Sequence, residues 1–596
     1  MRSAIAYALV AWVIVQVATA VLPVFETPPV FLKALVILLL LGFPMALVFS
    51  WIYEVTPEGI RKTEAEAGSH LKDHSRVSRR LNTVIVTFLL VAVVLLIYRE
   101  FKSDQRADFK SSPMEVREDT LNWSLAVLPF KNWSGDSNLE YVSDGMADEI
   151  TTSLMRLETL NKVIPFIESL KFKNTTLGLQ EISESLGVRF LLDGSVQLSG
   201  NQIRVKVQLL DALSQDYRWS EEFTGQWNNT DIFQIQANVV DNVLEHVSEN
   251  LAAPSGSAPL YRPTGNMEAY KNYLKGKHQL NKGSVVGIKN AIPLFEAAVA
   301  LDPTFAEAYA DLGEAWRVSG LFFGVYPERE AFEKARSAWQ QVLKLSKDDY
   351  LTRATNTSLV RASFYYEWDF EGCEEAYSQG TLPLGFQALY ETLTGRHRQA
   401  LLSIQKGIDQ NPAGGVLYAY QGMALYFLGR LPEAEQVLTR NRIFFKDDPY
   451  FLSEAAKWYF HMGAYQKSRD ALATINSAFD EDTPRLLALT AVYQYEDGQT
   501  QQLKTTLDQI RKKYASNESG SPAFHMALYY AHTGDYPASL DWLVRSFNRH
   551  EVEMVWLRSD PFLAPLRDNP RYLELYGQVG FPVSPAPVLT TPTFQR

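Results

Sequence analysis

A spacing of about 34 residues between turn glycines constrains the fold of this chain more than any other feature. Five glycines follow one another at steps of 34, 34, 35 and 36 residues: Gly395, Gly429, Gly463, Gly498 and Gly534. Four of them are followed five positions later by a small residue, namely Ala400, Ala434, Ser468 and Ser539, whereas Leu503 follows Gly498. Glycine permits a tight turn between two helices, and a small side chain permits two helices to cross closely. The spacing therefore predicts stacked helix pairs that bury a shared core.

The region from residue 267 to residue 580 resembles the tetratricopeptide repeat (TPR) family. Ala291, Phe295, Ala298 and Pro303 match the second helix of a repeat and its closing proline, and Tyr309, Leu312, Gly313 and Trp316 match the next first helix. Segments 558–562 and 566–572 resemble the terminal capping segment of such arrays. We count about seven repeats, with an insertion at 321–331, and we interpret Cys373 as a buried packing residue. The resemblance implies a superhelix whose concave face binds a protein or peptide.

Candidate binding residues follow from this register. In TPR proteins the first helix of each pair faces the concave side, so counting back from the turn glycines places five side chains there: Tyr426, Lys457, His461, Tyr495 and His532. Aromatic, basic and imidazole groups bind extended peptides through ring packing and hydrogen bonds. The alternative is that these side chains pack against the next repeat.

Residues 123–251 have the pattern of a small α/β domain. Residues 124–130 form a short apolar run that predicts a buried strand. Residues 188–198 and 202–210, joined by Ser199-Gly200-Asn201, predict a hairpin with one solvated face, and 216–225 predicts a third strand. Helices are expected from about Ser143, where Asp148 and Glu149 suit the start of a helix, and at 179–186 and about 231–250.

The same region resembles the TolB amino-terminal-domain-like family. The resemblance rests on Ser124–Phe130, Tyr141–Met146, Phe190–Val196, Gln208–Ala212 and Trp219–Glu221. Relatives of this kind join the domain to tetratricopeptide repeats, and some carry a cytoplasmic adenylate cyclase or a DNA-binding domain ahead of membrane spans. Neither is expected here, because the first apolar stretch begins near residue 5. The resemblance implies that any signalling output would need a separate partner.

Three apolar stretches in the first hundred residues predict transmembrane helices at 5–22, 31–53 and 81–98. Each approaches the roughly 20 residues needed to cross a bilayer, although a cleaved signal peptide is the alternative for the first. Lys and Arg are more numerous in the loop at 61–80 than after residue 98. We therefore expect a bacterial inner-membrane protein with a cytoplasmic N-terminus and periplasmic soluble domains, in contact with the lipid bilayer through three helices.

Motifs for chemistry are scarce. The sequence has neither a phosphate-binding glycine loop nor a nucleophile elbow, and its one cysteine excludes an intrachain disulfide and thiol-rich zinc sites. A net charge of −11, from 57 basic and 68 acidic residues, argues against nucleic-acid binding. We expect no enzyme activity, no cofactor and no metal, and a scaffold that binds a protein or peptide. The alternative is a sensory component that signals to a separate cytoplasmic cyclase or transcription regulator.

The expected fold class is therefore multi-domain: three transmembrane α-helices, a small α/β domain with a mixed sheet, and an all-α TPR superhelix. The expected boundaries are a membrane region at 1–100, a linker at 101–122, the α/β domain at 123–251, a linker at 252–266, the repeats at 267–580 and a tail at 581–596. The residues that define the repeats are Ala291, Pro303, Gly313, Gly395, Gly429, Ala434, Gly463, Gly498 and Gly534.

Overall fold

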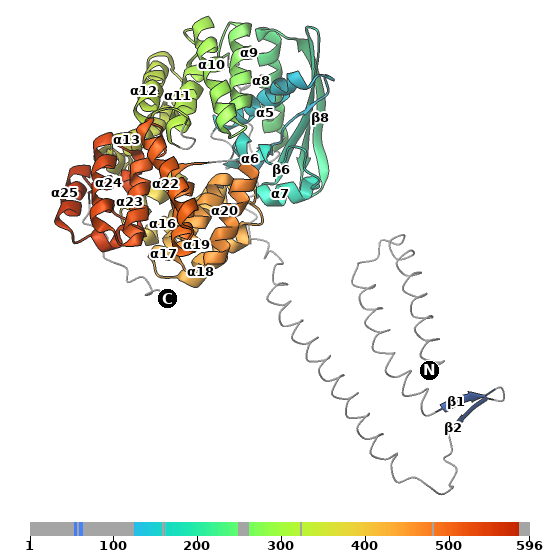
Figure 1. The fold of residues 1–596 in the computed structure, drawn as a ribbon. Helices are drawn as coiled ribbons and strands as arrows, with labels where there is room; N and C mark the ends of the chain where they lie inside the picture. Colours follow the sequence, from blue (N-terminus) through green and yellow to red (C-terminus); the bar gives the residue numbers. More distant parts are fainter. Residues whose placement is uncertain are drawn as a thin grey trace. The chain divides into compact units, whose positions relative to one another are not determined.

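The computed structural model describes residues 53–56, 59–62, 124–157, 160, 162–247, 262–321, 325–479 and 482–582. The chain divides into two compact units, Met1–Met114 and Glu115–Arg596. In the first unit the structure describes an antiparallel pair of strands, β1 (Tyr53–Thr56) and β2 (Gly59–Lys62), in which Tyr53 lies opposite Lys62. The second unit contains a sheet domain and a helical array (Figure 1).

The predicted fold class requires a correction at its membrane part. Among the helices that the structure describes, none is both long enough and apolar enough to cross a bilayer. Tyr53, the last residue of the predicted second span, is the first residue of strand β1. The rest of the predicted spans, 5–22, 31–52 and 81–98, lies outside the described residues. The described fold is a helical-repeat array with a small α/β domain, so the fold class with three transmembrane helices was wrong; the predicted localisation is untested and stays a prediction.

The sheet domain has a mixed sheet with strand order β5-β3-β6-β7-β8, and β4 lies beside β6. Its elements run in chain order: β3 (Ser124–Val127), β4 (Lys131–Asn132), η2 (Ser137–Leu139), α5 (Glu140–Met155), β5 (Lys162–Val163), α6 (Phe166–Leu170), α7 (Leu179–Leu186), β6 (Phe190–Ser199), β7 (Gln202–Asp211), β8 (Asp216–Gln226) and α8 (Asn229–Val247). Strand β3 pairs in parallel with β5 and β6, and β4 pairs in parallel with β6. Strands β6, β7 and β8 form an antiparallel meander.

Alternation along β7 shows why the sheet forms. Ile203, Val205, Val207 and Leu209 are buried on one face, and Val205 lies opposite Val196 of β6. Helices α5 and α8 cover this face, because Ile150, Val239 and Val205 belong to the same apolar core. The short helix α7 covers the other face through Ile182 and Leu186. A strand with period-two alternation can bury one face in this way only when a partner layer covers it.

The helical array comprises eight antiparallel helix pairs within the described residues, followed by a terminal segment. The pairs are α9 (Met267–Leu280) with α10 (Val285–Leu301), α11 (Ala306–Leu321) with α12 (Glu328–Leu345), α13 (Asp349–Tyr366) with α14 (Phe370–Ser378), α15 (Leu384–Leu393) with α16 (His397–Gln410), α17 (Gly415–Phe427) with α18 (Leu431–Asn441), α19 (Pro449–His461) with α20 (Tyr465–Phe479), α21 (Pro484–Glu496) with α22 (Thr500–Ala515), and α23 (Pro522–Thr533) with α24 (Tyr536–Arg549). The terminal segment holds η3 (Val552–Trp556), η4 (Pro561–Leu566) and α25 (Pro570–Val579).

The repeat-defining residues lie at turns and helix crossings. All five turn glycines have φ between +67° and +87°, a left-handed conformation that favours glycine. Ala291, Ala434, Ser468 and Ser539 are fully buried, and Pro303 lies in the turn between α10 and α11. A side chain at Gly313 would collide with the Trp339 ring. The array has one pair more than the count of about seven from the sequence. Trp368, with φ of +53°, occupies the turn between α13 and α14 where glycine is absent.

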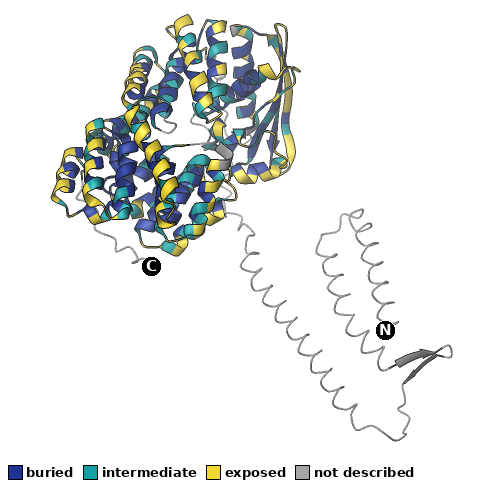
Figure 2. Ribbon diagram, viewed as in Figure 1, coloured by how far each residue is buried: buried dark blue, intermediate teal, exposed yellow. Residues whose placement is uncertain are grey.

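Two large apolar cores lie in the described residues, and Figure 2 marks the buried residues along the helices and strands. One joins the sheet domain to α9–α13. The other runs from α13 to the end of α25. The sheet domain and the first repeats are therefore one packed body.

Candidate functional site

The candidate site is the inner face of the array, where first helices of distant repeats meet. On α19 a single stripe lies on this face: Tyr450, Glu454, Lys457 and His461, spaced by four, three and four residues. Each of these side chains contacts a residue from another part of the chain. The Tyr450 hydroxyl forms a hydrogen bond with the Tyr420 hydroxyl, and Glu454 forms an ion pair with Arg485. Lys457 and His461 contact the terminal segment.

Two of the predicted binding residues contact the chain itself at this end of α19. Lys457 Nζ lies 2.8 Å from Asp560 Oδ2 and 4.5 Å from the ring centroid of Trp556. The His461 ring lies 4.5 Å from the ring of Phe562. Both contacts come from residues 551–567, which we call the cap segment. The cap segment thus covers the face that the sequence assigns to a partner.

The other three predicted residues have different surroundings. Tyr426 is buried, with its ring 5.3 Å from Trp458 and 6.1 Å from His461. His532 Nε2 lies 2.8 Å from Glu496 Oε1, and its ring is 5.4 Å from Phe562. Tyr495 is 42% exposed. Two of the five, His461 and His532, therefore contact Phe562, and the role of all five in partner binding stays a prediction.

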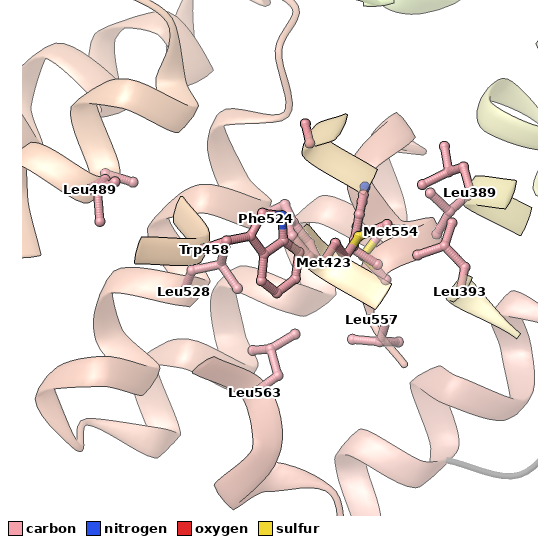
Figure 3. Packing of buried hydrophobic residues seen from close by; sticks show 14 of the residues in the cluster. Leu389, Leu393, Met423, Trp458, Leu489, Phe524, Leu528, Met554, Leu557 and Leu563 are labelled. Carbon is pink, nitrogen blue, oxygen red and sulfur yellow. The ribbon is translucent and has the colours of Figure 1, made fainter. Parts of the chain in front are cut away.

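The cap segment is part of the core. Met554, Val555, Leu557 and Leu563 are fully buried. Figure 3 shows Met554, Leu557 and Leu563 beside Met423, Trp458, Phe524 and Leu528 of α17, α19 and α23. Full burial of an aliphatic side chain contributes roughly 2 kcal/mol. A partner could displace this segment only at a large cost in stability.

An ion pair between Lys457 and Asp560 lies under the cap segment. Burial raises the pKa of Asp560, but the Lys457 ammonium more than reverses this effect, so that the pKa lies below its ordinary value. Burial lowers the pKa of His461 to about 3, which keeps the imidazole neutral. Lys457 and Asp560 are therefore a buried ion pair with one cation for one anion.

Two glutamates join the cap segment to distant repeats. Glu328, at the start of α12, accepts hydrogen bonds from the backbone N–H groups of Gly520, Ser521 and Val552 at 3.0–3.2 Å. Glu551 accepts from the N–H groups of Ala523 and Phe524 at 3.0 and 2.8 Å. Burial raises the pKa of both carboxyls, and the charge of Glu551 raises that of Glu328 further.

The opposite end of the inner face carries a polar cluster that we call the inner patch. Its members are Glu314 and Arg317 of α11, Arg361 and Tyr365 of α13, Tyr420 of α17, Tyr450 and Glu454 of α19, Arg485 of α21 and Glu553 of the cap segment. The sequence analysis missed these residues, because they come from six elements. A signal was present in the spacing of pairs on one helix face, such as Arg361 with Tyr365 and Tyr450 with Glu454, which are four residues apart.

The charged groups of the inner patch are not paired one to one. Arg317 binds both carboxylate oxygens of Glu314, at 2.8 and 2.5 Å, and Arg361 reaches one of them at 3.3 Å. Arg485 instead pairs with two carboxylates, Glu454 and Glu553. The side chains of Glu314 and Arg361 are 33% and 28% exposed, so this end of the patch is open to solvent.

A second charged cluster fixes the sheet domain to the first repeat. Lys277 of α9 lies 3.1 Å from Asp148 and 3.0 Å from Glu149, and His278 Nδ1 lies 2.9 Å from Asp144. Helix α5 begins at Glu140, so Asp144, Asp148 and Glu149 lie inside the helix and not at its start as predicted. These acids pair with α9. On the far side of the domain, Lys162 donates to the carbonyl oxygen of Asp409 near the end of α16, and Lys171 donates to that of Ala413 in the turn after α16.

One family model matches the sheet domain of this chain. Residues 121–242 match the family of the HilA/YgeH-like transcriptional regulator, second domain. Over 189 residues the chain is 30% identical to putative adenylate cyclase 3 of Rhizobium meliloti, which is 32% of each protein. The chain therefore spans about a third of that relative's length.

Solved structures whose backbones resemble this chain match it with low TM-scores. The human IFIT1 dimer with PPP-AAAA is 14% identical with a TM-score of 0.35, over 59% of this chain and 78% of that one. The APC/C hetero-tetramer Cut9–Hcn1 is 13% identical with a TM-score of 0.25, over 59% and 85%. Lipoprotein GNA1162 from Neisseria meningitidis is 20% identical with a TM-score of 0.16, over 22% of this chain and 99% of its own.

Proposed function

We propose that this chain is a non-enzymatic scaffold that binds a protein or peptide partner at the inner patch. The observation that carries the proposal is the convergence of nine polar side chains from six elements at a place where Glu314 and Arg361 stay open to solvent. Helical repeats commonly bind partners on such a face. Three arginines and three glutamates balance in the patch, which favours a protein partner over the polyanionic backbone of nucleic acid.

The inner patch is a better candidate than the five residues predicted from the sequence. Lys457, His461 and His532 already contact the cap segment or a neighbouring repeat, and Tyr426 is buried. A partner at that end would have to remove residues such as Leu557 and Leu563 from the core. At the inner patch a partner needs only to replace water.

Photo-crosslinking in cells tests this proposal. A benzoylphenylalanine at Tyr450, in the inner patch, should give a defined crosslinked adduct. The same group at Leu402, which lies on α16 and is 63% exposed, is the matched control and should give none. Adducts from Leu402 alone, or from neither position while the chain is folded, would contradict the proposal.

A second candidate function is a sensory component that acts on a separate cyclase or transcription regulator. The similarities to a HilA/YgeH-like regulator domain and to a putative adenylate cyclase favour it, as does the resemblance of residues 123–251 to TolB amino-terminal domains. The pairing of Lys277 with Asp148 and Glu149 would transmit a change at the repeats to the sheet domain. Copurification of a cyclase or regulator that is lost in Lys277→Met, but kept in Lys271→Met, would support this candidate; equal recovery with both variants would contradict it.

A further inference from the structure

The cap segment shows how this inner face binds a peptide. Asp560 places a carboxylate 2.8 Å from Lys457. Two residues later, Phe562 packs among the rings of Phe460, His461 and His532 at 4.5–5.4 Å between centroids. The bound sequence is Ser559-Asp560-Pro561-Phe562, an acid followed closely by an aromatic ring. A cation beside aromatic side chains is therefore the recognition chemistry that this face already uses.

A cation without a full counter-charge lies at the other end of the face. Arg317 binds Glu314 with two hydrogen bonds, so that the carboxylate is largely satisfied before Arg361 reaches it at 3.3 Å. Nε of Arg361 has no hydrogen-bond partner among the described residues. Two guanidinium groups thus share one carboxylate. Burial and the charge of Arg317 lower the pKa of Arg361, which agrees with a missing anion.

Aromatic residues border this cation, as they border Lys457. Tyr365 lies one turn after Arg361 on the same face of α13 and is partly exposed. Its ring lies 6.2 Å from Phe386, which holds it in place. Tyr450, also partly exposed, donates to or accepts from Tyr420 at 2.9 Å. Arg361 and these rings have the same arrangement as Lys457 and its neighbours. The difference is that, among the described residues, no segment of the cap type lies against them.

We propose that Arg361 and Tyr365 form a subsite for an acidic side chain of a partner peptide, and that an aromatic residue close to this acid packs beside Tyr365 and Tyr450. The inference rests on the proposed function, because it assigns the ligand class of the same patch. A charge-assisted hydrogen bond from a guanidinium to a carboxylate is strong and directional, particularly when it is bidentate. The Arg361 side chain is 28% exposed, so its guanidinium can be reached by such a carboxylate.

Fluorescence anisotropy with the full chain tests this inference. The probe is a fluorescein-labelled, glycine-flanked peptide with the sequence Ser-Asp-Pro-Phe, and its counterpart contains Asn in place of Asp. The wild-type chain should bind the Asp peptide about tenfold more tightly than the Asn peptide. Arg361→Gln should abolish this preference. Arg353→Gln, the same change on an exposed part of α13, should keep it, and Arg361→Lys should keep part of it.

A third variant locates the binding site. If the peptide entered by displacing the cap segment, Lys457→Met would abolish the preference, and the inference would fail. An equal affinity for the Asp and Asn peptides, or a preference that survives Arg361→Gln, would also overturn it. The crosslinking experiment at Tyr450 separates these failures from failure of the scaffold itself: adducts from Tyr450 without any preference for Asp would leave a scaffold whose ligand is not acidic.

Discussion

The two ends of the inner face differ in what covers them. At α19 and α23 the cap segment fills the face, and one cation, Lys457, meets one anion, Asp560. At α11 and α13 two cations, the buried Arg317 and the partly exposed Arg361, share the partly exposed Glu314. Similar helix faces are therefore electrically neutral where the chain covers them, and they keep an incompletely paired positive charge where it does not. The unused charge marks the place for a partner.

The covered end should be the more sensitive to loss of one charge. Lys457→Met leaves Asp560 buried without its counter-ion, which should lower the free energy of unfolding by about 4 kcal/mol. Chemical denaturation measures the effect. Lys467→Met removes an exposed pair with Glu435 and should cost less than about 1 kcal/mol. Equal costs for the two variants would show that the cap segment is loosely held.

Loss of an apolar contact of the cap segment should have the second-largest effect on stability. Leu563→Ala creates a cavity in the apolar core that also contains Trp458 and Leu528, and it should cost about 3 kcal/mol. Leu402→Ala, at an exposed position, should change stability by less than about 0.5 kcal/mol. Denaturation midpoints that coincide for both variants would mean that the cap segment leaves the core in solution.

The contact of α12 with the cap segment should depend on pH. Burial and the charge of Glu551 raise the pKa of Glu328, so the folded state keeps a proton that the unfolded carboxyl loses above about pH 4.5. The stability from Glu328 is therefore full below about pH 4.5 and is lost as pH rises through the folded pKa. The stability of wild type relative to Glu328→Gln should fall by about 1 kcal/mol between pH 5 and pH 8.

Urea denaturation at several pH values measures this difference. Glu330→Gln, on the same helix and exposed, should show no such pH dependence. A difference that grows with rising pH would mean that the backbone N–H groups of Gly520, Ser521 and Val552 hold an ionised carboxylate.

The open end should tolerate substitution best. Arg317 continues to bind both oxygens of Glu314 in Arg361→Gln. Stability should therefore change by less than about 1 kcal/mol. A larger loss in thermal unfolding would assign Arg361 to the fold and remove the free cation on which the open end depends.

Local pattern predicted much of this fold. The hairpin of β6 and β7 is confirmed, with Val196 opposite Val205, because alternation and a Gly200 turn fix its register. The helix at 179–186 is confirmed with Gly187 in the left-handed conformation at its end. Such features depend on residues close in the sequence, and the sequence displays them directly.

The features that could not be predicted from the sequence depend on long-range contacts. The acids of α5 suited a helix start, but they pair with Lys277 and His278, more than 100 residues away. The turn before α14 lacks glycine, since Trp368 takes the left-handed position and stacks on His550 at 3.7 Å. The resemblance at residues 558–572 implied a cap, but no spacing rule indicated that it lies on the inner face. The inner patch is hidden for the same reason.

Amide hydrogen exchange of the full chain, with and without the Ser-Asp-Pro-Phe peptide, tests the difference between the two ends most directly. Binding at the open end should slow exchange in α13, residues Asp349–Tyr366, and leave residues 557–567 unchanged. Faster exchange in residues 551–567, with no protection of α13, would show that the partner replaces the cap segment and would contradict the account.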